Sequence, residues 1–94
     1  MSDHVLQQLF CTIKDRHANP RRESYTAQLL SEGEDEILKK VGEEAVEVIL
    51  AGKSQGNQRL VSEVADLTYH VLVLMALRGV TPGDVAEELL RRRR

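Results

Sequence analysis

Apolar residues recur along most of this chain at the three- and four-residue spacing of one face of an α-helix. The first such stretch predicts a helix that begins after Ser2 or Asp3, either of which is a suitable N-cap, and that fades near His17. The sequence ANPRRE then interrupts the pattern, because Pro20 restricts the residue before it and removes a hydrogen-bond donor. The apolar face of this first helix consists of Val5, Leu6, Leu9, Phe10 and Ile13.

The pattern predicts four further helices. A short helix covers residues 24–31 approximately, with Ser24 as its cap, and a long helix runs from about residue 34 to about residue 53. The turn GKSQGN separates it from a second long helix over about residues 58–78, which ends at Gly79. Thr81 and Pro82 begin a last helix that continues to the C-terminus. Gly42, inside the first long helix, suggests a close packing contact or room for a ligand.

These elements predict an all-α fold, as one domain over residues 1–94. Two long helices joined by a turn of about five residues must lie antiparallel. Their apolar faces need more cover than three shorter helices provide, so we expect a helical bundle that is completed by dimerisation, as a homodimer or a higher homo-oligomer. The scarcity of aromatic residues, one Phe and two Tyr without Trp, also favours helices over sheets.

Charge and cysteine content restrict the class of protein. The formal net charge of -2 excludes a general nucleic-acid binder with a basic surface, and we expect the terminal run of arginines from Arg91 to Arg94 to be solvated. The single cysteine, Cys11, excludes an internal disulfide, and its apolar neighbours predict a buried, inert thiol. We find no signal peptide and no apolar stretch of the roughly 18 residues that span a bilayer. We therefore expect a cytoplasmic protein without a membrane partner.

Acidic residues interrupt the apolar face of the second long helix in the segment SEVADLTYHVLVLMALRG. At 100° per residue, Glu63, Asp66 and His70 share one face of this helix and lie among apolar residues. In the first long helix, Glu44 and Glu47 form a similar stripe within GEEAVEV. Antiparallel packing of the two helices would direct all four carboxylates toward one small space.

Such a cluster needs cations, because carboxylates repel one another and the burial of an unpaired one costs several kcal/mol. Either ion pairs or a metal can supply the positive charge. Two acid pairs at i,i+3 spacing on neighbouring helices favour a metal, and ligands that are all oxygen suit Mg²⁺ or Mn²⁺. A bundle di-iron site would have a His at the position of Asp66. The side chains available for ion pairs instead are Lys39, Lys40, Arg59 and Arg78.

The acids also carry a family resemblance. EEAVE (residues 43–47) followed by EVAD (residues 63–66) resembles the E-E-x-x-E and E-x-x-D signature of the all-α nucleoside triphosphate pyrophosphohydrolases related to MazG. SYTAQLL, ILKKVGEEAVEVILAGK and EVADLTYHVLVLMALRGV are similar, in order and spacing, to segments of the phosphoribosyl-ATP pyrophosphohydrolases of histidine biosynthesis. The resemblance extends from about Val5 to about Leu90, and Arg21-Arg22-Glu23 departs from the shorter turn of that family.

The resemblance implies a MazG-like helical bundle and an enzyme that converts phosphoribosyl-ATP and water to phosphoribosyl-AMP and pyrophosphate. It implies Mg²⁺ as the cofactor, held by Glu44, Glu47, Glu63 and Asp66. Glu43 matches the signature too, and is either an outer-shell residue that helps to activate water or a solvated surface residue.

The resemblance also suggests residues that contact the substrate. Lys39 and Lys40 are candidates for the triphosphate, or else pair with acids four residues away: Lys39 with Glu43, and Lys40 with Glu36 or Glu44. His70 either orients a ligand and touches the substrate or is an ordinary core residue. Tyr25 and Thr26 either close over the nucleotide or ribose or pack and cap the short helix.

Two other functions remain open. One is a house-cleaning pyrophosphohydrolase of the same superfamily that acts on ordinary or damaged nucleoside triphosphates; SYTA, KKVGEE and YH favour the histidine-pathway enzyme over it. The other is a non-catalytic helical dimerisation module, in which Lys and Arg pair with the acids.

Overall fold

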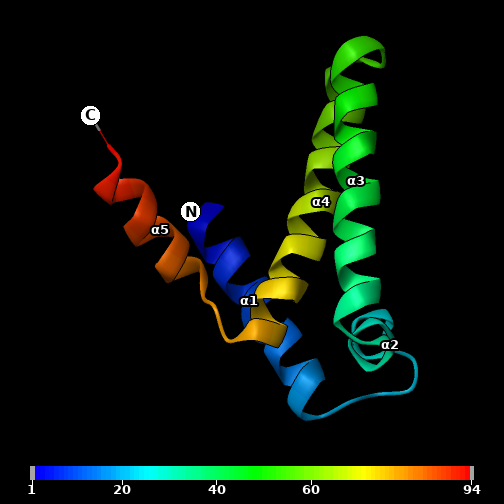
Figure 1. Ribbon diagram of the computed structural model, residues 1–94, viewed down its shortest axis with the longest axis vertical. Coiled ribbons are helices and arrows are strands. Elements are labelled where there is room, and N and C mark those ends of the chain that lie inside the picture. The colour runs from blue at the N-terminus through cyan, green and yellow to red at the C-terminus, as the bar shows by residue number, and fades with distance from the viewer. Residues whose placement is uncertain (1, 94) are drawn as a thin grey trace.

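The computed structural model describes the backbone of residues 2–93 and the side chains of residues 4–93, which form five helices and no strand (Figure 1). The predicted all-α fold with two long helices is therefore confirmed. The predicted N-cap at Ser2 or Asp3 and the last arginine of the terminal run lie outside the described side chains. The helices are α1 (Ser2–Ala18), α2 (Tyr25–Glu32), α3 (Glu34–Ser54), α4 (Gly56–Arg78) and α5 (Pro82–Arg91).

The long helices α3 and α4 form an antiparallel hairpin (Figure 1). Only Gln55 separates them, so the turn of about five residues that the sequence predicted is wrong, and both helices extend into GKSQGN. Gly56 has a φ of 82°, a left-handed conformation that glycine adopts without steric cost. This conformation lets the chain reverse within a single residue.

The apolar core lies at the base of the hairpin, where α1 and α2 pack against it. Toward the Gln55 end of the hairpin, little side-chain surface is buried, and several large apolar side chains on α3 and α4 are exposed. Much of the apolar surface of α3 and α4 is therefore not covered by the other helices of the chain. The buried core residues are Phe10, Ile13, Leu29, Leu30, Ile37, Leu72 and Val73.

Helix α1 differs from the prediction in two ways. Cys11 is exposed, so the predicted burial of this thiol is wrong. The reason is geometric: Phe10 and Ile13 face the core, and Cys11 lies about 100° away from Phe10 around the helix. Val5 and Leu6, which the sequence placed on the apolar face, are also exposed because α1 extends beyond the core at this end.

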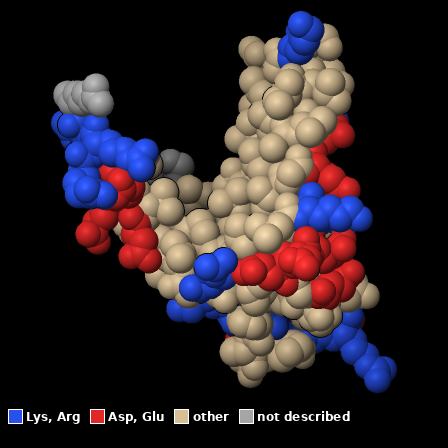
Figure 2. Space-filling model, in the orientation of Figure 1, with Lys and Arg blue, Asp and Glu red and all other residues tan. Residues whose placement is uncertain are grey.

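Helix α5 diverges from the α3–α4 hairpin, and the molecule has the outline of an open V (Figure 1, Figure 2). Its start is as predicted: the Thr81 hydroxyl accepts a hydrogen bond from the Asp84 amide, the Asp84 carboxylate accepts one from the Thr81 amide, and Pro82 follows the cap. The helix ends at Arg91 and not at the terminus, and buries none of its residues. The first two arginines of the terminal run are exposed and pair with Glu88.

Helix α4 is long and apolar enough to cross a membrane by length and composition, with a mean hydropathy of 1.6 over its most apolar window. By this measure the expectation that no stretch of the chain reaches that length is wrong. The core helix of a soluble protein can pass the same test, and only 22% of this window is buried inside the chain. Glu63 and Asp66 interrupt the apolar residues, and charged side chains are costly at the centre of a bilayer. Helix α4 therefore has the surface of a core helix without a complete cover within the chain.

Candidate active site

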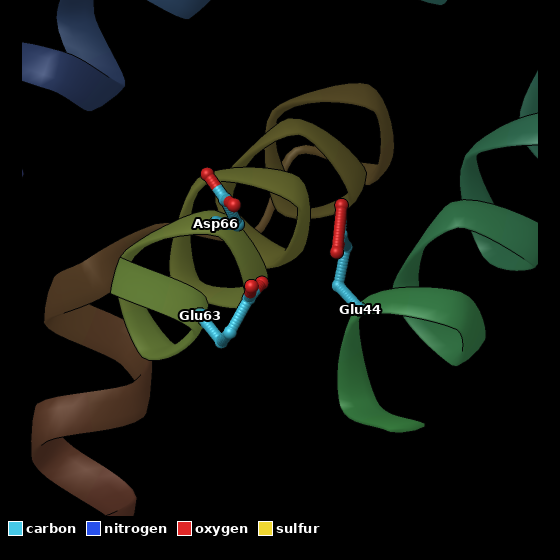
Figure 3. Close-up of side chains that lie close together, drawn as sticks. All are labelled: Glu44, Glu63 and Asp66. Atoms are coloured by element: carbon cyan, nitrogen blue, oxygen red, sulfur yellow. The ribbon is translucent and has the colours of Figure 1, made fainter. Parts of the chain in front are cut away.

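The α3–α4 hairpin brings three carboxylates together: Glu44 from α3, and Glu63 and Asp66 from α4 (Figure 3). One carboxylate oxygen of each residue lies within 4.8 Å of the others. Glu63 is buried, with 5% of its surface exposed, whereas Glu44 is half-buried and Asp66 is exposed. The acidic cluster, as we call these three residues, therefore extends from the helix interface to a surface that solvent reaches.

Two further acids of the sequence signature lie outside this cluster. Glu47, the fourth predicted ligand, is half-buried on α3 about one turn after Glu44. Glu43 is exposed, and its carboxylate lies 3.7 Å from the ammonium group of Lys40. The structure thus groups three of the four predicted ligands and leaves Glu43 on the surface.

Among the described residues, Arg59 is the cation that contacts the acidic cluster. Its guanidinium donates a hydrogen bond to the carboxylate of Glu63, four residues later on α4. The Arg59 side chain is 56% exposed and that of Glu63 only 6%. Since a buried carboxylate without a partner costs several kcal/mol, this ion pair compensates for the burial of Glu63. In the sequence Arg59 is only an ion-pair candidate, although its i,i+4 spacing from Glu63 is a signal that it belongs to the site.

Lys39 and Lys40 make long contacts with neighbouring acids. The Lys39 ammonium lies 4.0 Å from Glu36, and that of Lys40 lies 3.7 Å from Glu43. Both lysines therefore pair with an acid three residues away, and the predicted alternative, pairing with acids four residues away, is wrong about which acids they contact. Exposed helical pairs of this kind contribute only a few tenths of a kcal/mol. The two ammonium groups are therefore little restrained by the protein.

A polar contact joins α2 to α4 next to the acidic cluster. The Tyr25 hydroxyl lies 3.1 Å from Nε2 of His70, and Nδ1 of His70 lies 2.8 Å from the backbone oxygen of Asp66. Because a carbonyl oxygen only accepts, Nδ1 carries the hydrogen, and in the neutral imidazole Nε2 then accepts from Tyr25. His70 is buried. Both of its nitrogens are thus engaged with the protein, one helical turn from Asp66.

Tyr69 belongs to the same contact region, although it is not among the site residues expected from the sequence. Its hydroxyl is hydrogen-bonded to that of Thr26, and its ring contacts the His70 ring edge-on at a centroid distance of 5.0 Å. Burial raises the pKa of the Tyr69 phenol, and the hydrogen bond to Thr26 partly opposes this shift. The signal in the sequence is that Tyr69 directly precedes His70, so that both side chains can contact the SYTA segment.

The donor atoms of the acidic cluster fit a hard divalent cation. All of them are carboxylate oxygens, which Mg²⁺ and Mn²⁺ prefer. The three carboxylates concentrate negative charge at this place, and the single guanidinium of Arg59 offsets only part of it. Because negative charge remains, the cluster is suited to Mg²⁺ in both ligand type and electrostatics.

Comparison with known proteins identifies the family. The family model described as phosphoribosyl-ATP pyrophosphohydrolase matches residues 6–93. The chain belongs to this family. The resemblance in the sequence is thereby confirmed, and the match runs through Arg21-Arg22-Glu23, where the turn departs from the expected length.

Curated relatives of this member of the phosphoribosyl-ATP pyrophosphohydrolase family align with at least 98% of the chain. A protein of Sulfurisphaera tokodaii is 55% identical over 92 residues, which is 98% of each chain. One of Saccharolobus islandicus is 48% identical over 94 residues and the full length of both chains. One of Geotalea daltonii is 46% identical over 92 residues, 98% of this chain and 87% of its own. All three are named phosphoribosyl-ATP pyrophosphatase.

Proposed function

We propose that this protein hydrolyses phosphoribosyl-ATP to phosphoribosyl-AMP and pyrophosphate, the second step of histidine biosynthesis, with Mg²⁺ as its cofactor. The observation that carries the proposal is the acidic cluster in a chain that matches the family over residues 6–93. The name shared by the three relatives supports the choice of substrate over other nucleoside triphosphates. A single domain and a cytoplasmic location are parts of the same proposal.

Glu44, Glu63 and Asp66 are the proposed ligands of Mg²⁺, because their oxygens already lie together. Glu47 is the proposed fourth ligand, and it would need to change its side-chain conformation to join them. The bound cation would neutralise charge on the phosphate oxygens and help to ionise the attacking water. Ligand types that are all oxygen support Mg²⁺ over zinc or iron.

The reaction itself requires positioning and charge stabilisation more than covalent chemistry. The oxygen of water forms a bond to phosphorus at the α–β linkage, the bond from that phosphorus to the bridging oxygen breaks, and pyrophosphate leaves. The water proton passes to a carboxylate, and Glu43 is the candidate because it matches the signature and lies outside the acidic cluster. No Ser or Cys nucleophile is needed for this route.

The remaining predicted residues are proposed to bind the substrate or to shape its site. Lys39 and Lys40 can contact the triphosphate, since their own ion pairs are long and exposed. Tyr25, Thr26 and His70 are bonded to partners within the protein, which supports a role in orienting Asp66 and shaping the nucleotide site.

We further propose that the protein functions as a homodimer. Exposed apolar side chains form a stripe on α3, on the side away from the buried Ile37 and Ala51. Gly42 lies in this stripe, and among the described residues no atom outside its chain neighbours and its own helix backbone lies within 4 Å of the position that its Cβ would occupy. A helical glycine costs about 1 kcal/mol relative to alanine, and close approach of a second copy would explain it. The stripe consists of Leu38, Gly42, Val46 and Ile49.

The decisive test is pyrophosphate release by the purified protein. Phosphoribosyl-ATP, ATP and a panel of deoxynucleoside triphosphates are incubated separately, each with and without Mg²⁺. We expect Mg²⁺-dependent release from phosphoribosyl-ATP. Release mainly from the other nucleotides would identify a house-cleaning enzyme, and no release from any of them would leave the non-catalytic dimerisation module.

A further inference from the structure

Arg59 lies on the face of α4 that carries the acids. At 100° per residue, Arg59, Glu63 and Asp66 fall within an arc of about 60°. Arg59 bonds to Glu63, the most buried member of the acidic cluster. Among the described residues, Glu63 has no other cationic partner within salt-bridge distance. Arg59 is thus its counter-ion in the metal-free protein.

We infer that Arg59 is an exchangeable counter-ion: it neutralises Glu63 until the divalent cation binds, is displaced from that carboxylate by the cation, and then binds a phosphate group of the substrate. The inference rests on the proposed function. It assigns to Arg59 two successive anionic partners, first a carboxylate of the protein and then a phosphate.

The displacement follows from the burial of the two partners. Glu63 lies in the helix interface with 6% of its side chain exposed and so has little room to move, whereas the longer side chain of Arg59 is 56% exposed and has space around it. A divalent cation that binds among oxygens within 4.8 Å of one another would repel a guanidinium on the same carboxylate. The mobile partner of the ion pair is therefore the one that leaves.

The second contact follows from where Arg59 remains. Its backbone is fixed about one turn from Glu63, so the displaced guanidinium stays beside the acidic cluster. The substrate phosphates would lie at that cluster, and a guanidinium binds phosphate with two parallel hydrogen bonds. Arg59 can therefore exchange one anion for the other without a movement of the helix.

Metal binding without substrate tests the first contact. Binding of Mn²⁺ is measured by titration calorimetry or electron paramagnetic resonance for the wild type, Arg59→Gln and Arg59→Lys. The matched control is Arg78→Gln. Arg78 lies at the far end of α4, and its substitution removes an exposed ion pair with Glu34 of α3. We expect about 10-fold tighter Mn²⁺ binding by Arg59→Gln, because a competing cation is removed, and near-wild-type binding by Arg59→Lys and Arg78→Gln.

Thermal unfolding provides an independent measure. Without metal, Arg59→Gln leaves Glu63 buried and unpaired, so its melting temperature should fall below that of Arg78→Gln. Saturating Mg²⁺ should then raise the melting temperature of Arg59→Gln by more than that of the wild type. Unchanged or weaker Mn²⁺ binding by Arg59→Gln, or no Mn²⁺ binding by any variant, would overturn the exchange.

Steady-state kinetics at saturating Mg²⁺ test the second contact. We expect Arg59→Gln to raise KM for phosphoribosyl-ATP about 10-fold, Arg59→Lys to recover part of this loss, and Arg78→Gln to match the wild type. An unchanged KM in Arg59→Gln would overturn the phosphate contact. A wild type that binds Mn²⁺ but does not cleave phosphoribosyl-ATP would refute the proposed function, while the Mn²⁺ titrations would still decide whether Arg59 competes with the metal.

Discussion

The three carboxylates of the acidic cluster differ in what surrounds them. Glu63 is buried and ion-paired, Glu44 is half-buried, and Asp66 is exposed. Substitution of Asp66 can therefore separate chemistry from stability more cleanly than substitution of Glu63, because an exposed side chain contributes little to folding.

Asp66→Asn and Glu47→Gln should each lower kcat/KM for phosphoribosyl-ATP by about 100-fold or more, because each removes a proposed ligand of the metal. Circular dichroism and the free energy of unfolding should stay close to those of the wild type. The assay is Mg²⁺-dependent pyrophosphate release. Near-wild-type turnover by Asp66→Asn would refute the metal assignment, whereas the same result for Glu47→Gln alone would reduce the ligand set to the three clustered residues.

Tyr69 should make stability fall at high pH. Burial raises its pKa above the ordinary value of 10.0, so the folded state holds the phenol proton more tightly than the unfolded state. Its contribution is complete below the unfolded pKa and is lost as the pH rises through the folded pKa. The urea midpoint between about pH 9 and about pH 11.5 should therefore decline less steeply in Tyr69→Phe than in the wild type. Equal slopes would contradict this assignment.

At the scale of the helices, the start of α2 is fixed by one side-chain cap. The Ser24 hydroxyl accepts a hydrogen bond from the Ala27 amide at 3.1 Å and so fixes the start of this eight-residue helix. The next two residues, Tyr25 and Thr26, hold the contacts to α4. The cap therefore helps to hold Tyr25 and Thr26 in place, and these two residues contact α4 next to Asp66.

Ser24→Ala should reduce the free energy of unfolding by about 1 kcal/mol, because it removes the N-cap hydrogen bond. It should also speed amide hydrogen exchange in α2 and lower kcat/KM by more than Ser31→Ala. Ser31 is a suitable control because it lies on the same helix, is exposed and bonds only to the backbone of its own turn. Equal effects of the two substitutions on stability and on kcat/KM would show that the Ser24 cap does not influence the site.

The sequence predicted the helices well because their signals are local. Apolar spacing, Gly79 and the Thr81–Pro82 start all act within one or two turns, and the structure has each of them. Its errors concern packing. The length of the α3–α4 connection depended on how tightly Gly56 turns, and the exposure of Cys11 depended on which arc of α1 met the core.

The acids of the candidate site were also predictable, since their spacing places them on facing helices. The partners were not: pairing of Arg59 with Glu63, and of Tyr69 with Thr26, depends on side-chain conformations that no periodicity encodes. The grouping of Glu44 without Glu47 has the same origin.

At the scale of the molecule, the apolar stripe on α3 should be the dimer interface. Ile49→Glu places a charge in the stripe and should convert a dimer to a monomer, as measured by analytical ultracentrifugation. Leu89→Glu is a matched control, because Leu89 on α5 is 65% exposed and Ile49 is 66% exposed. A dimer that survives Ile49→Glu but not Leu89→Glu would move the interface to the other arm of the V in Figure 2.

The contact between α2 and α4 gives this protein a built-in optical reporter. The chain has two tyrosines and no tryptophan, and both tyrosines lie in that contact, one of them bonded to the histidine that holds the backbone of Asp66. Tyrosine fluorescence from the unlabelled protein therefore originates in this contact, next to Asp66. Occupancy of the site by a cation could be followed by stopped-flow fluorescence, with no dye and no engineered fluorophore.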